Sequence, residues 1–138
     1  MKRRRAQNRF YSCPSCQAGL NPDNTIMLVG EHGGSRSLVG FHPEPGNYRV
    51  FTPPGFEVQP GDAWEFRCPV CDEDLKTKQN EKLCAIKMLV GDAPFLVLFS
   101  RVAGEKATFV MSSEGVQEQH GADAGAYLKH LVQMKYWL

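Results

Sequence analysis

The sequence predicts an α+β fold that is mostly antiparallel β structure, and three observations predict it. Short apolar runs recur at intervals of roughly 8–12 residues between turns rich in glycine and proline. Two matched pairs of cysteines bracket the first group of runs, and a segment with helical spacing of apolar residues closes the chain. The chain has 138 residues, 42% of them hydrophobic and 22% charged, which fits one modest core and argues against global disorder.

The first predicted strands lie between the two cysteine pairs. Apolar runs occur there at 25–29, 37–41, 48–51 and 63–66. Turn sequences separate these runs, among them Asn21-Pro22-Asp23, Gly33-Gly34 and Pro45-Gly46-Asn47. Short strands at this spacing indicate antiparallel pairing, so we expect a β-rich amino-terminal part.

The second half of the chain predicts a three-stranded meander. Its strands are expected at 82–90, 95–102 and 107–111, with Gly91-Asp92-Ala93-Pro94 as the first turn. Residues 95–99 are apolar at every position, so both faces of this strand should be covered. We therefore expect it to be the central strand of its sheet.

The end of the chain predicts a helix that covers the meander. Asp123 is a candidate cap for a helix over 124–137. Tyr127, Leu131, Met134 and Leu138 follow at helical spacing, which favours packing of this stripe on the sheet. The alternative is a partner-binding helix or a homodimer face, because no polar residue follows Trp137 and Leu138 in the sequence.

Four of the five cysteines form a short internal repeat. The pairs are Cys13-Pro14-Ser15-Cys16 and Cys68-Pro69-Val70-Cys71, and each continues as C-P-x-C-x-x-x-L with an aromatic residue two positions before its first cysteine. Two residues between cysteines let the chain turn once, so that both sulfurs face one point. Two such turns supply the four thiolates of a closed tetrahedral Zn²⁺ site. The spacing predicts one zinc ion bound by Cys13, Cys16, Cys68 and Cys71.

The cysteine pairs have three other interpretations. Disulfides are disfavoured because no export signal precedes the pairs. A redox C-x-x-C places its reactive cysteine at a helix amino terminus, which duplicated pairs followed by Gly19 or by Asp72-Glu73-Asp74 do not suggest. Iron is an open alternative to zinc, since thiolates hold either metal.

The two pairs, with their prolines and flanking aromatics, resemble the zinc knuckles of zinc-ribbon and rubredoxin-like domains. The stretch from Trp64 to Cys71 is also similar to the second half of bacterial CpXC-type domains. The resemblance covers about thirty residues around the knuckles; it implies the same four metal ligands and no activity. Those families often place glycine directly after the second cysteine, whereas this chain has Gln17 and Asp72, and the departure leaves the identity of the metal open.

The remaining reactive side chains do not form a recognisable catalytic set. Cys84 stands alone in an apolar run, which is typical of a small buried side chain rather than a fifth ligand. The four histidines have no metal-binding spacing, and His42 in the turn-rich insertion is the one that we single out. We therefore expect that the protein is not an enzyme.

Positive charge is concentrated at the start of the chain. Residues 1–12 hold five cations and no acid, whereas the rest of the chain holds 11 cations and 15 acids. A basic arm of this kind can contact an acidic protein or nucleic acid, while the acidic body is a poor polyanion binder. The candidate partner-binding residues are Lys2, Arg3, Arg4, Arg5 and Trp137.

These observations divide the chain into a flexible basic arm at 1–12, a zinc-knuckle β module at 13–78, and the meander with its helix at 79–138, packed as one unit. We interpret the protein as a non-catalytic structural-zinc module that binds another macromolecule, with a protein as the expected partner. The alternatives are a rubredoxin-like iron electron carrier and a nucleic-acid-binding zinc-ribbon protein. No membrane span and no signal peptide are evident, so we expect a cytoplasmic protein.

Overall fold

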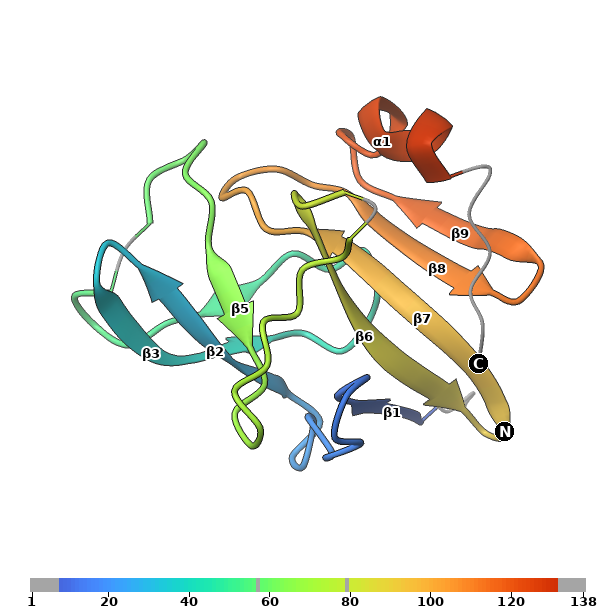
Figure 1. Cartoon of the computed structure of the whole chain (residues 1–138), viewed down its shortest axis with the longest axis horizontal. Coiled ribbons are helices and arrows are strands. Elements are labelled where there is room, and N and C mark those ends of the chain that lie inside the picture. The colour runs from blue at the N-terminus through green and yellow to red at the C-terminus, as the bar shows by residue number, and fades with distance from the viewer. Residues whose placement is uncertain (1–7, 57, 79, 132–138) are drawn as a thin grey trace, which may run out of the picture.

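The structure consists of two antiparallel β-sheets (Figure 1). It is a computed structural model that describes residues 8–56, 58–78 and 80–131. The five-stranded sheet has the order β1 (Arg9–Ser12), β6 (Leu83–Val90), β7 (Ala93–Ser100), β8 (Thr108–Ser112) and β9 (Gly115–His120). The four-stranded sheet has the order β4 (Val50–Phe51), β3 (Ser35–Phe41), β2 (Ile26–His32) and β5 (Glu65–Arg67).

Local sequence explains the hairpin between β2 and β3. The strands pair from Ile26 with Phe41 to His32 with Ser35, so that only Gly33 and Gly34 remain to make the turn. Both glycines have positive φ, 60° and 85°, as a tight type I′ hairpin turn requires. Glycine adopts this conformation without a steric penalty, which fixes the register of the two strands.

The strand β7 lies at the centre of the five-stranded sheet and is covered on both faces, as the sequence predicted. Its residues alternate between two cores: Phe95, Val97 and Phe99 pack in the first, and Leu96 and Leu98 pack in the second. A strand buried on both faces needs apolar residues at consecutive positions, which explains the continuous run.

The first core lies between the two sheets, and the second lies on the opposite face of the five-stranded sheet. Buried side chains of the first core come from both sheets, namely Tyr11, Ile26, Leu28, Val39, Phe66, Ile86, Met88, Val97 and Val110. The second core contains Leu83, Leu98, Phe109 and Met111 together with Ala124, Tyr127 and Leu131. The last two residues belong to helix α1 (Gly125–Leu131), which therefore covers the outer face of this sheet (Figure 1).

The expectation of an α+β fold is wrong, because the described residues are nearly all β structure with one helix of seven residues. The carboxylate of Asp123 does not cap this helix but accepts a hydrogen bond from the Lys106 backbone N–H at 2.8 Å. The packing of Tyr127 and Leu131 on the sheet agrees with the predicted stripe. Met134, Trp137 and Leu138, which belonged to the same expected helix, lie outside the described residues.

The predicted three-stranded meander is present as β6, β7 and β8, and two further strands flank it. On one side β1 pairs with β6, from Arg9 opposite Val90 to Ser12 opposite Lys87. On the other side β9 pairs with β8. Lys2, Arg3, Arg4 and Arg5 lie outside the described residues, and the division of the chain into segments 1–12, 13–78 and 79–138 stays a prediction. Within the described part of the chain, no helix has the length and apolar character needed to cross a membrane.

Candidate metal centre

The structure brings the four predicted ligands together. The sulfur atoms of Cys13, Cys16, Cys68 and Cys71 all lie within 4.8 Å of one another. The Sγ atoms of Cys13 and Cys71 are 3.8 Å apart, and those of Cys16 and Cys68 are 3.7 Å apart. These separations are far longer than a disulfide bond of about 2.05 Å, and all four thiols are free. They match the edge of a ZnS₄ tetrahedron, which is about 3.8 Å for Zn–S bonds near 2.3 Å.

The first pair of ligands lies in a closed knuckle that follows β1. The Gln17 N–H donates to the Cys13 carbonyl at 2.9 Å, and the Cys13 N–H donates to the Ala18 carbonyl at 3.0 Å. The Leu20 N–H then donates to the Tyr11 carbonyl at 2.8 Å, so the chain returns alongside the strand from which it came. These bonds hold the two cysteines on one side of the turn.

The second pair lies in a knuckle with the same hydrogen bonds, which follows β5. The Asp72 N–H donates to the Cys68 carbonyl at 2.9 Å, and the Cys68 N–H donates to the Glu73 carbonyl at 3.1 Å. The Leu75 N–H donates to the Phe66 carbonyl at 2.9 Å. The repeat seen in the sequence is therefore a repeat of backbone structure, including the aromatic residue before each first cysteine.

The residue after each second cysteine adopts a left-handed conformation. Gln17 has φ 66° and Asp72 has φ 65°, a region that glycine adopts most easily. This conformation explains why glycine suits this position in zinc knuckles. Because this chain has side chains at both positions, each turn carries a steric cost of about 1–2 kcal/mol.

One ligand of each knuckle belongs to the first core, and the other faces solvent. Cys13 and Cys68 are 0% and 1% exposed and pack among the apolar side chains between the sheets, whereas Cys16 and Cys71 are exposed. The site therefore lies at the boundary between core and solvent. Its inner half is enclosed by protein, and its outer edge is open to water.

Backbone N–H groups approach the inner sulfurs. The Ser15 N–H donates to Cys13 Sγ at 3.3 Å, and the Val70 and Cys71 N–H groups donate to Cys68 Sγ at 3.3 and 3.4 Å. Burial raises the pKa of Cys68, but these two N–H groups and the neighbouring thiols outweigh it and lower the pKa below its usual value. Burial raises the pKa of Cys13. The N–H groups stabilise the thiolate form that binds a metal ion.

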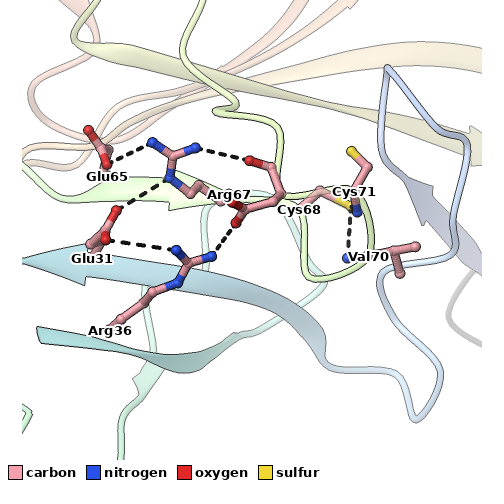
Figure 2. Close-up of polar contacts among 8 residues, drawn as sticks. Glu31, Arg36, Glu65, Arg67, Cys68, Val70 and Cys71 are labelled. Carbon is pink, nitrogen blue, oxygen red and sulfur yellow. Dashed lines mark hydrogen bonds and ion pairs between the residues drawn. The ribbon is translucent and has the colours of Figure 1, made fainter.

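Charged side chains brace the second knuckle against the four-stranded sheet (Figure 2). The guanidinium of Arg67 donates to Glu31 at 3.3 Å, to Glu65 at 3.1 Å and to the backbone carbonyl of Asp72 at 2.9 Å. Arg36 contacts the carboxylates of Glu31 and Asp72. Exposed ion pairs contribute little to stability, so we assign this network the role of orienting the knuckle.

This network was not predicted from the sequence. The sequence gives little sign of these ion pairs, because Arg36 lies 36 positions before Asp72. Only the pairing of β2 with β3 and β5 brings the two side chains together.

The other candidate residues do not belong to the four-sulfur cluster. Cys84 is fully buried in the first core, where burial raises the pKa of its thiol to about 12, as expected for a side chain that acts as a small apolar group. His32 pairs with Asp62 at 3.3 Å. His42 lines a cavity between the sheets.

The left-handed turns predict that Gln17→Gly stabilises the protein. Removal of the side chain relieves the strain at φ 66°, and we expect the free energy of unfolding to rise by about 0.5–1 kcal/mol. The matched control is Gln119→Gly in β9, which should lower that free energy by about 1 kcal/mol. Glycine in a strand interior loses more conformational entropy on folding and has no side chain to pack. Denaturant titration of both metal-loaded variants measures the difference, and a loss of stability in Gln17→Gly would contradict the assignment.

The ligand set predicts opposite outcomes for two cysteine substitutions. Cys68→Ser should lose the bound metal and more than about 4 kcal/mol of stability, since it removes a buried ligand. Cys84→Ala, equally buried in the same core, should keep one metal ion per chain. Elemental analysis and thermal melting of both variants check this. Stoichiometric metal in Cys68→Ser with an unchanged melting midpoint would exclude this cysteine as a ligand.

Comparison with protein-family models, with curated proteins and with solved structures finds no significant match to this chain.

Proposed function

We propose that this protein is a non-catalytic module that a structural zinc ion stabilises and that binds another macromolecule, in the first place a protein. One observation carries the structural half of the proposal: four sulfur atoms from two matched knuckles converge at separations that suit tetrahedral coordination.

The positions of the knuckles support a structural role for the metal. One knuckle continues from β1 in the five-stranded sheet, and the other continues from β5 in the four-stranded sheet. An ion shared by both knuckles joins the two sheets directly and closes a chain segment of about fifty residues. In such sites the free energy of metal binding contributes to folding.

The donor set supports the absence of catalysis at this site. Structural zinc sites have four protein ligands, whereas catalytic zinc sites keep one position for water or substrate. Here four thiols are present, and the two inner ones are enclosed by the core. A zinc ion held by all four would be saturated by protein.

An iron electron carrier is the second candidate, and one observation favours it. Cys16 and Cys71 are exposed, so the outer edge of the site is accessible to a redox partner. A four-thiolate iron site would have to exchange electrons through such an edge. Zinc is preferred because the residues after each cysteine pair are Gln17 and Asp72, while an electron-transfer site favours small uncharged residues there.

Binding of a protein is supported by charge and by exposed apolar side chains. The acidic body of the chain disfavours nucleic acid as the main partner, whereas the basic segment at residues 2–5 suits an acidic protein. On the four-stranded sheet, Leu38 and Phe51 are 52% and 46% exposed on neighbouring strands, β3 and β4.

Metal removal tests the structural half of the proposal. Treatment with a strong chelator should lower the melting midpoint of the full chain, and one equivalent of Zn²⁺ should restore it. The stabilisation should weaken as the pH falls, since protons compete with the metal for the thiolates. Elemental analysis identifies the metal: one iron and a colour that bleaches on reduction would favour the electron carrier. A metal-stripped protein with an unchanged midpoint would overturn the proposal.

The proposed binding of a protein partner is tested by replacing four residues by alanine, namely Lys2, Arg3, Arg4 and Arg5. Capture of an acidic protein partner on the immobilised chain should fall at least tenfold, because the attraction is electrostatic. The matched control replaces only the three arginines by lysine, keeps the charge and should keep most of the binding. Capture that is unaffected by alanine would remove the basic segment from the proposal. A captured molecule that nuclease destroys would identify the partner as nucleic acid.

A further inference from the structure

A chamber that is partly open to solvent lies between the two sheets, beside the metal centre but separate from its sulfur atoms. The cavity has a volume of about 210 Å³. Its walls include Leu28 and Phe66 from the four-stranded sheet and Ile86, Val97 and Phe99 from the five-stranded sheet. All of these are apolar, and they face one another across the first core.

Contacts between aromatic rings stiffen the walls. The ring of Phe66 stacks on Trp64 at a centroid distance of 5.1 Å and meets the edge of Phe41 at 5.3 Å. It also contacts Phe99 of the other sheet at 5.9 Å. Because each ring is held by others, the chamber has little freedom to collapse.

The segment between β3 and β4 contributes one side of the chamber and is anchored at two points. Near its start, the Tyr11 hydroxyl donates to the Pro43 carbonyl. Near its end, the Tyr48 hydroxyl donates to the His120 carbonyl at 3.1 Å and lies 2.9 Å from the hydroxyl of Thr108. Both anchors connect this segment to the five-stranded sheet, so it is attached across the gap rather than left as an open loop.

The chemistry of the lining favours an uncharged apolar occupant. Among the described residues, no fully buried polar side-chain atom lacks a hydrogen-bond partner, so the buried part of the lining offers no unpaired side-chain group to a polar ligand. Charges at the lining come in both signs: Lys106 is accompanied by Glu44 and Glu105. Apolar walls hold water weakly, and enclosed apolar cavities of about 150 Å³ bind benzene.

We propose that this chamber is a binding site for an uncharged aromatic molecule of one or two rings. The size follows from the volume, which exceeds that of benzene-binding cavities by about 40%. The aromatic walls supply edge-to-face and stacking contacts for a planar ring. The site goes beyond the proposed structural role of the metal and does not depend on which metal is bound.

Binding of indole to the full-length, metal-loaded protein tests the site. Indole has about the size that the chamber accepts, and we expect a Kd on the order of 0.1 mM from ligand efficiency. The double variant Leu28→Phe and Val97→Phe fills the chamber and should weaken binding at least tenfold. Val116→Phe adds the same bulk beside the second core and should leave the affinity unchanged. Titrations followed by NMR chemical shifts measure all three.

Two further measurements keep the proposal falsifiable if the filled variant does not fold. In the native chain, NOEs from indole should reach methyl groups of Leu28, Ile86 and Val97; NOEs confined to exposed methyls such as those of Leu38 or Leu89 would overturn the site. Benzoate, of similar size but charged, should bind at least tenfold more weakly than indole. Equal binding of both, or no shift with indole up to about 2 mM, would also contradict the proposal.

Discussion

The meeting of four cysteine sulfurs is the constraint on which the rest of the structure depends. Cys13 and Cys68 are buried between the sheets, and each begins a knuckle that extends a strand of a different sheet. Four sulfurs within 4.8 Å can all be ionised only if a cation lies among them, because like charges at this distance repel strongly. A bound ion therefore converts a repulsive cluster into a link between the two layers, at the point where the first core meets solvent.

The aromatic residue before each knuckle connects this link to the core. The carbonyls of Tyr11 and Phe66 accept the hydrogen bonds that close the knuckles, while their side chains are 1% and 2% exposed. Both side chains also line the chamber between the sheets. The aromatic position of the repeat thus serves three purposes. Its backbone carbonyl closes the turn, and its ring fills the core and borders the cavity. The metal centre and the chamber share a wall.

The sequence signals that the structure confirms are local ones. Consecutive apolar residues at 95–99 indicated a strand covered on both faces, and β7 is that strand. The sequence was least informative where long-range contacts, not the local preference of the residues, decide the structure. The strand Gly115–His120 has mostly exposed polar side chains, so no alternation revealed it, and backbone pairing with β8 holds it. Asp123 has the composition of a helix cap, yet its carboxylate accepts a hydrogen bond from the distant backbone of Lys106.

The sequence by itself determined the two cysteine pairs, the knuckle turns and most strand positions, because each depends on spacing within about ten residues of chain. Only the tertiary structure decided that β1 pairs with β6, that Arg36 reaches Asp72, and that His42 borders a chamber. These contacts join segments that are far apart in the chain, and several partners would suit each local pattern equally well. The choice among them follows from burying both faces of one sheet while bringing the cysteine sulfurs to one point.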